Sequence, residues 1–489
     1  MYRYLSVALT VLLVASAGAG RLVRLRGMDY EGALTLQAEG YKVAAGNLIE
    51  HWVDVMISDE SEATMLTRYS DDVKVLPREF AELLPENSRD AGYYYSPGEN
   101  WTFWCTLAED HSDLADTPMT IGQSYEGRDI YMIKMTSGSG PPDKPALYYS
   151  SLIHAREPGG NSVLIDFATW LADNYNSDTR ATFILDNAEV YFVPIANPDG
   201  YEYNMPGGGN QRKNMNWTNG DGIDLNRNWE HKWGYDDQGS SPDPYDETYR
   251  GTSPASEVET QEQRDFMNDV APIAALHYHT YGGYLLYPWG YVNQPTPDQS
   301  TFESWAAHMT MYNGYEYGRA GQVLYPVNGE QCDYSYSDTL GSPSILAMTP
   351  EVADNGFWGG QNDTTLIEEF CEDCRWMNII IAMNALEYVG VETPPSFEAR
   401  PMLFVGAIAP NPVSTAMSFD VRAQVGTNVE ATIFDLCGRK VANLDLGRVA
   451  DAGVQAVNWS VPEDLSSGVY MLRVENGGDA VERRFTVLK

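Results

Sequence analysis

The sequence predicts an α/β fold, a sheet flanked by helices, with a small N-terminal α+β segment and a C-terminal β-sandwich. Three observations support this prediction. The middle of the chain alternates apolar strand-like runs with helical patterns. Two prolines, Pro394 and Pro395, then interrupt the pattern, and short alternating strands separated by turn residues follow them. The 489 residues suffice for about three domains.

Residues 1–19 are predicted to be a signal peptide. Arg3 supplies a positive charge before the apolar run Leu5–Ala15, and small residues around Ala17 permit cleavage. The run is shorter than the roughly 20 apolar residues that cross a bilayer, and no later stretch is long enough. We expect a secreted, extracellular protein without a membrane span; a buried N-terminal helix is the alternative.

Residues 20–88 form the predicted N-terminal segment. Strand patterns at Trp52–Ile57 and Val73–Leu76 enclose a helical pattern at Ser58–Leu66. The segment carries no group of catalytic residues. A pro-segment and a simple structural appendage therefore both remain open.

Residues 89–390 form the predicted α/β domain, and 391–400 a stiff linker to the sandwich at 401–489. The strands expected in the α/β domain are Ala146–Ile153, Glu189–Pro194, Ile273–Tyr278 and Ser344–Thr349, and the helices are Asn161–Leu171 and Leu366–Tyr388. The strands expected in the sandwich include Asn428–Leu436, Gln455–Val461 and Gly468–Val474. Polar residues cluster where several strands of the α/β domain end, which is the usual place for a site in such sheets.

The charge and the cysteine content exclude two classes of protein. The chain has 31 basic and 69 acidic residues, a net charge of −38. A surface this acidic repels phosphate backbones, so we expect no nucleic-acid partner. The five cysteines are too few for a disulfide framework.

A metal site is indicated at the end of the first predicted strand. His154 and Glu157 stand three residues apart directly after this strand, and an imidazole with a carboxylate can bind one Zn²⁺. A catalytic zinc needs a third protein ligand. His277 and His279 are two apart on a strand and would face the same side. His279 lies at the strand's exit and is the better ligand, whereas His277 is predicted to be a hydrogen-bonded core residue.

These residues resemble the zinc site of the metallocarboxypeptidases of the carboxypeptidase A/B type. Further matching motifs occur in the family's order, and together they cover about residues 90–390. These motifs are Asn197–Tyr201, Asp224–Trp229, Glu247–Gly251, Ser256–Glu259 and Leu285–Tyr291. The resemblance implies the carboxypeptidase fold, with a mixed central sheet, and a single zinc ion as cofactor.

The resemblance also implies the roles of the residues around the metal. His154, Glu157 and His279 would be the three ligands. Glu351 would be the general base, and Arg212 would stabilise the oxyanion.

Further roles carried over from the family concern orientation and binding. Asp224 would orient His154. Asn226 and Arg227 would bind the free C-terminal carboxylate, which a planar guanidinium suits, and Tyr325 would cap it. For Arg156, an auxiliary anion contact and a structural salt bridge are both open.

The resemblance defines less well which C-terminal residue the site would accept. In the family the residue before Asp333 is apolar or acidic according to the terminal residue removed, and here it is Cys332. A buried cysteine behaves as a small hydrophobe, which favours a neutral or aromatic terminal residue. An inward-pointing Glu330 would instead admit basic residues.

Residues 401–489, the predicted sandwich, resemble a second family. Pro410–Pro412, Ile433–Val441 and Ser467–Tyr470 are similar to the C-terminal sorting domains of bacterial type IX secretion. This implies the secretion machinery as a partner and attachment to the cell surface as an option. A plain β-sandwich spacer is the alternative.

The function expected from these residues is that of a secreted zinc carboxypeptidase. It would hydrolyse the C-terminal bond of peptides and proteins with a free C-terminus, as a monomer. Two alternatives remain: a zinc amidohydrolase acting on cell-wall peptides, and a non-catalytic peptide-binding surface protein. The complete set of Asn226, Arg227 and Tyr325 stands against the amidohydrolase.

Overall fold

The computed structural model describes most of the chain in two compact units, Met1–Phe80 and Ala81–Lys489. The signal peptide, the helix expected at Ser58–Leu66 and most of the linker at 391–400 lie outside the described residues. The described residues are 21–26, 42–47, 52–57, 73–75, 94–205, 209–337, 344–353, 356–361, 363–392, 403–405, 408, 413–423, 428–435, 439–448, 455–462, 465–476 and 479–489.

The described part of the first unit is an antiparallel sheet. Its strands are β1 (Arg21–Arg26), β2 (Lys42–Asn47), β3 (Trp52–Ile57) and β4 (Val73–Val75), and their order is β2-β3-β1-β4. The strands expected at Trp52–Ile57 and from Val73 are therefore confirmed.

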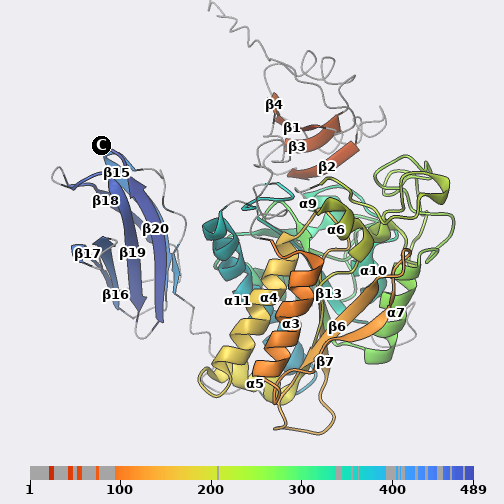
Figure 1. Ribbon diagram of the computed structural model, residues 1–489, viewed down its shortest axis with the longest axis horizontal. Coiled ribbons are helices and arrows are strands. Elements are labelled where there is room, and N and C mark those ends of the chain that lie inside the picture. Colours follow the sequence, from red (N-terminus) through yellow and green to blue (C-terminus); the bar gives the residue numbers. More distant parts are fainter. Residues whose placement is uncertain are drawn as a thin grey trace, which may run out of the picture. The chain divides into compact units, whose positions relative to one another are not determined.

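A mixed sheet runs through the first part of the second unit, as predicted (Figure 1). The strand order is β12-β11-β13-β9-β7-β8-β6-β5, and β10 pairs with β13. The central strands β13, β9, β7 and β8 are parallel, whereas β6 and β5 on one side and β11 on the other are joined antiparallel. The strand bounds are β5 Met119–Gln123, β6 Asp129–Met135, β7 Ala146–Ser150, β8 Glu189–Val193, β9 Ala274–His277, β10 His279–Thr280, β11 Tyr284–Tyr287, β12 Glu316–Arg319 and β13 Leu346–Val352.

Helices cover both faces of this sheet, and the alternation of β7 shows why. Tyr149 packs on Phe167 of α4, while its neighbour Tyr148 packs on Phe266 of α7, because successive strand residues face opposite sides. Figure 1 shows α3 and α4 in front of the sheet and α7 at its other side. The helix bounds are α3 Pro97–Asp110, α4 Gly159–Asn174, α5 Thr179–Asn187, α6 Pro198–Asn204, α7 Val258–Val270, α8 Gln299–Met309, α9 Ala320–Val323, α10 Gln331–Tyr336 and α11 Thr364–Tyr388.

Close packing brings the start of α4 against the end of β9. A Cβ on Gly160 would lie 2.6 Å from Cβ of Tyr278, and one on Gly159 would lie 2.9 Å from Cγ2 of Thr280. Only glycine allows this approach. The loop before α4 and the strand segment around Tyr278 are therefore held side by side.

Replacing Gly160 by alanine is expected to destabilise the protein by about 1–3 kcal/mol, because the added methyl group overlaps the Tyr278 side chain at its base. Urea unfolding of the Gly160→Ala variant measures this loss. Gly138→Ala is the matched control, since a Cβ there has no neighbour within 4 Å among the residues that the structure describes. Equal stability of the two variants would contradict this account of the packing.

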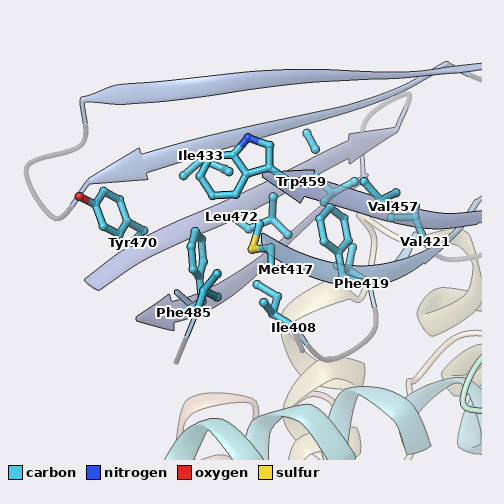
Figure 2. Packing of buried hydrophobic residues seen from close by; sticks show 14 of the residues in the cluster. Ile408, Met417, Phe419, Val421, Ile433, Val457, Trp459, Tyr470, Leu472 and Phe485 are labelled. Carbon is cyan, nitrogen blue, oxygen red and sulfur yellow. The ribbon is translucent and has the colours of Figure 1, made fainter. Parts of the chain in front are cut away.

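The C-terminal strands form two antiparallel sheets, as expected for a β-sandwich (Figure 2). One sheet has the order β14-β15-β18 and the other β17-β16-β19-β20. Figure 2 shows Met417, Phe419 and Trp459 of the first sheet packed with Leu472 and Phe485 of the second. The bounds are β14 Phe404–Val405, β15 Ala416–Arg422, β16 Asn428–Asp435, β17 Lys440–Arg448, β18 Gln455–Ser460, β19 Gly468–Asn476 and β20 Asp479–Val487.

Candidate metal centre and active site

Two imidazoles and one carboxylate converge at the end of the central strands. Nδ1 of His154 lies 2.9 Å from Oε1 of Glu157 and 3.0 Å from Nδ1 of His279. Nδ1 of His279 lies 3.0 Å from Oε2 of Glu157. All three side chains are buried, and within the described residues they form the one cluster of three potential metal ligands.

Local structure explains how residues distant in sequence meet here. His154 and Glu157 lie in the loop between β7 and α4, and the amide N–H of Ala155 donates to the carbonyl of Arg212 at 3.1 Å. His279 is the first residue of β10, directly beside Glu351 of β13. The Gly159–Gly160 contact described above holds that loop against β10.

The donor set fits a zinc ion. Two nitrogens and one carboxylate oxygen are ligands that Zn²⁺ prefers, and three protein ligands leave a position open for water. Burial, and then the neighbouring His154, lower the pKa of His279 to about 4. The imidazole is therefore neutral, as a metal ligand must be.

The strand break at Tyr278 separates the two histidines. His277 ends β9, where its Nδ1 lies 2.9 Å from Oγ of Ser150 and its Nε2 lies 3.0 Å from Oγ of Ser335. The prediction that His277 is a hydrogen-bonded core residue is confirmed. Because the chain re-enters the sheet at His279, that residue alone of the pair reaches the cluster.

Asp224 contacts the nitrogen of His154 that faces away from the cluster. Its Oδ1 lies 3.2 Å from Nε2 of His154 and accepts the amide N–H of Asn226 at 2.9 Å, while its Oδ2 accepts Nη2 of Arg212 at 2.9 Å. Burial alone would raise the pKa of Asp224, but the positive charge of Arg212 holds it well below its usual range. An ionised carboxylate therefore contacts the second nitrogen of His154.

Arg212 and Glu351 are brought to the same place. Nη1 of Arg212 lies 3.1 Å from Nδ1 of His154 and 3.6 Å from Oε1 of Glu157. Glu351 pairs with His279 across β13 and β10, and the residue is half-buried. Burial raises the pKa of Glu351 well above its usual range, and the charge of Glu157 raises it further. Glu351 is thus suited to holding a proton.

Asn226 and Arg227 lie on the short helical turn that follows Asp224. Oδ1 of Asn226 accepts the amide N–H of Gln331 at 2.9 Å, which leaves its Nδ2 on the side of His279, 3.4 Å from Nε2. Arg227 is buried, its Nη1 donates to the carbonyl of Asn226 at 2.8 Å, and its Nε has no hydrogen-bond partner among the described residues. A buried guanidinium with an unused donor is suited to an anion.

Tyr325 faces the same charges. Burial raises the pKa of its hydroxyl, while Arg227 and Arg212 lower it and Glu351 raises it. The charges of Arg227, Arg212 and Glu351 therefore reach the Tyr325 hydroxyl, while its partly buried ring packs against the apolar cluster that includes Tyr284 and Val323.

A family model of zinc carboxypeptidases matches residues 101–374, which is more than half of the chain. The chain belongs to the zinc carboxypeptidase family. It is a metallocarboxypeptidase whose cofactor is one zinc ion, and His154, Glu157 and His279 form a cluster that could hold it. A second model, of a secretion system C-terminal sorting domain, matches residues 407–488.

Individual relatives of this carboxypeptidase include both main types. Carboxypeptidase A1 of Rattus norvegicus is 30% identical over 314 residues, covering 62% of this chain and 73% of the relative. Carboxypeptidase B of the same species is also 30% identical, over 303 residues, with 59% and 71% covered. Overall identity therefore does not distinguish the two types.

The fold of the carboxypeptidase agrees with solved structures. The crystal structure of thrombin activatable fibrinolysis inhibitor is similar with a TM-score of 0.62 and 22% identity, covering 75% of this chain and 99% of that chain. At this identity the likeness concerns the fold. No helix among the described residues has the length and apolar character needed to cross a membrane.

Two residues predicted to contact substrate have other partners in this carboxypeptidase. Arg156 is buried, its Nη1 lies 3.1 Å from Oε2 of Glu247, and its guanidinium stacks on Phe357 at 4.1 Å. An auxiliary anion contact and a structural salt bridge were both open for Arg156, and the structure contains the salt bridge. Cys332 is also buried, and its thiol donates to the carbonyl of Ala347 at 3.4 Å within the core.

A buried acidic pair, Glu330 and Asp333, adds a feature that sequence analysis did not find. Asp333 accepts the amide N–H groups of Gly290 and Tyr291 at 2.9 and 3.2 Å. The sequence indicates Glu330 as a candidate for substrate contact, but no pattern in it assigns a role to Asp333. The glycine at position 290, after the tyrosine-rich strand, was the available signal, since a Cβ there would overlap Oε1 of Glu330.

Proposed function

We propose that this enzyme is a secreted carboxypeptidase that hydrolyses the C-terminal peptide bond of peptides and proteins, with Glu351 as general base. The observation that supports this most strongly is the position of Arg212 and Arg227. Two buried guanidinium groups flank the cluster of His154, Glu157 and His279 in a protein with a net charge of −38. The carboxylates of Glu157 and Asp224 balance these two charges, so a bound Zn²⁺ would leave the region positive and suited to a substrate that ends in a carboxylate.

Zinc held by His154, Glu157 and His279 would lower the pKa of a water molecule and polarise the scissile carbonyl. Glu351 would accept the proton of this water and deliver it to the leaving amine. Burial raises its pKa, which favours uptake of the proton, while the charges of Arg212 and Arg227 lower it, which favours release to the amine. Asp224 would keep His154 oriented through the 3.2 Å contact.

Three further side chains would position the substrate. Arg227, with its unpartnered Nε, and Nδ2 of Asn226 would bind the terminal carboxylate. Tyr325 would close over it. Arg212 would donate to the oxygen that gains negative charge during attack, from its place 3.1 Å from His154.

The sorting-domain match supports an extracellular location. We propose that residues 401–489 direct export through a type IX secretion system, after which the enzyme is released or attached to the cell surface. On this proposal residues 89–390 form the catalytic domain, and residues 20–88 a pro-like segment ahead of it.

The proposed activity is tested with blocked dipeptides that carry either a free or an amidated C-terminus. We expect hydrolysis of the free acids, loss of activity with a chelator, and recovery with one equivalent of Zn²⁺. Hydrolysis that survives chelation, or equal rates on the amidated peptides, would reject the proposal. Cleavage confined to cell-wall peptides would favour the amidohydrolase instead.

A further inference from the structure

His277 is a buried histidine that has no role in the proposed reaction, yet it links three elements that carry the site. The residue is 1% exposed, and it ends β9 opposite Ser150, which ends β7. Its Nδ1 lies 2.9 Å from Oγ of Ser150, and its Nε2 lies 3.0 Å from Oγ of Ser335 on α10. One imidazole therefore joins the ends of two neighbouring strands to a helix.

The hydrogen bonds through this imidazole run in one direction. The hydroxyl of Ser335 donates to the carbonyl of Gln331 at 2.8 Å. A hydroxyl has a single hydrogen, so Ser335 accepts from Nε2 of His277. Burial disfavours the charged form of the ring, and in a neutral imidazole the other nitrogen is an acceptor. Nδ1 therefore accepts the hydroxyl of Ser150, and the chain of bonds runs from β7 to α10.

The Ser150 end of this chain leads to the metal ligands. Ser150 is four residues before His154, and His277 is two residues before His279. The amide N–H of Tyr278 also donates to the carbonyl of Ser150, at 2.8 Å. One backbone bond and one side-chain bond thus hold the two strand ends together at the point where β9 stops. The spacing of the two ligand-bearing segments depends on both bonds.

The break after β9 is held from both faces of the sheet. His277 points to the face that α10 covers, where it bonds Ser335. The hydroxyl of Tyr278 donates to Oδ1 of Asn378 on α11 at 2.6 Å, because successive strand residues face opposite sides. The chain is thus fixed on both sides of the sheet immediately before His279, which sets the direction in which His279 leaves the break.

The Ser335 end of the chain leads to the group proposed to bind the substrate terminus. Ser335 lies one turn after Gln331 on α10 and bonds its carbonyl. The amide N–H of Gln331 donates to Oδ1 of Asn226 at 2.9 Å, which leaves Nδ2 of Asn226 for a ligand. The bond from His277 to Ser335 therefore anchors the start of α10, and with it the amide that orients Asn226.

We propose that His277 is a positioning residue with two separable effects. Through Ser150 it sets the spacing of the two histidine ligands, and through Ser335 it places Asn226 for the terminal carboxylate. The second effect rests on the proposed function. Misplacing a reacting group by about 1 Å can lower the rate about 100-fold even when the cause is distant, so a residue outside the reaction can control it.

The first experiment removes one hydroxyl at a time and measures two quantities. Zinc affinity is measured by competition with a chelator, and binding of the terminus by the ratio of kcat/KM for free-acid and amidated dipeptides. Ser150→Ala should weaken zinc binding about 10- to 100-fold. Ser335→Ala should lower the free-acid preference about 10-fold and leave the zinc affinity unchanged.

Two variants of the histidine should give the complementary pattern. The side-chain carbonyl of His277→Asn can replace Nδ1 as acceptor for Ser150 but does not reach Ser335, so zinc affinity should be kept and the free-acid preference reduced. The longer amide of His277→Gln can replace Nε2 as donor to Ser335, so the preference should be kept and zinc affinity reduced. If a serine variant unfolds, these two variants must still show the opposite patterns.

Ser337→Ala is the matched control. This serine is also buried and directly follows α10, but its hydroxyl donates to the carbonyl of Tyr334 in the same helix. It should change neither quantity. If Ser150→Ala and Ser335→Ala alter both quantities together, or neither, His277 is an ordinary core residue and the inference is wrong.

The outcomes also separate this inference from the proposed function. Zinc affinity is measured without a substrate, so the effect through Ser150 is tested even in a protein that hydrolyses no peptide. Absence of carboxypeptidase activity would reject the proposed function and the effect on Asn226 with it. Unchanged zinc affinity in both Ser150→Ala and His277→Gln would reject the effect on the ligands, whatever the activity.

Discussion

Replacing Glu351 by glutamine is expected to reduce kcat about a thousandfold while the protein keeps its zinc. The amide cannot accept the proton of the attacking water or return it to the leaving amine, and general-base catalysis is worth about 10²–10⁴-fold. The substitution preserves the shape of the side chain. It also removes a carboxyl group whose pKa is raised by burial and by Glu157, so folding should not suffer.

Steady-state kinetics with a blocked dipeptide and a zinc assay on the dialysed protein measure both expectations. Glu387→Gln is the matched control, since this residue is exposed at the end of α11. Substantial turnover in Glu351→Gln would show that the base is misassigned. Loss of zinc together with activity would instead show that Glu351 supports the metal rather than the proton transfer.

Much of the metal centre could be predicted from the sequence because its geometry follows from local rules. Side chains two apart on a continuous strand face the same side, so His279 can turn to the metal without His277 only if the strand is interrupted between them. The structure has this break at Tyr278. The strand before His154 and the helix after Glu157 were likewise visible as an apolar run followed by a helical pattern, and β7 and α4 lie there.

The rest of the site depends on contacts that no local pattern encodes. Whether Cys332 or Glu330 faces the substrate is decided by how α10 packs on β13, which turns the thiol of Cys332 toward Ala347. The salt bridge from Arg156 to Glu247 joins residues 91 positions apart. The sequence motifs predict that these residues lie near the site, but the direction in which each side chain points follows from tertiary packing.

Replacing Arg227 by methionine is expected to lower kcat/KM for peptides with a free C-terminus about 100-fold and to leave the slow cleavage of amidated peptides nearly unchanged. Methionine fills a similar volume but has no donor for the carboxylate. The guanidinium is buried, and its Nε donates to no other residue in the part of the chain that the structure describes, so the group keeps an unused donor for a ligand. Losing one partner of a buried charged contact typically costs about 2–5 kcal/mol.

The ratio of kcat/KM for free-acid and amidated peptides is therefore the decisive measurement, because a general loss of structure would lower both values together. Arg264→Met is the matched control. Nη1 of Arg264 lies 2.8 Å from Oε1 of Glu230, and Arg264 also pairs with Asp265, so its charge is already balanced. The control should keep the full preference for the free acid. An unchanged ratio in Arg227→Met would mean that another cation, with Arg212 the nearest candidate beside the cluster, holds the terminal carboxylate.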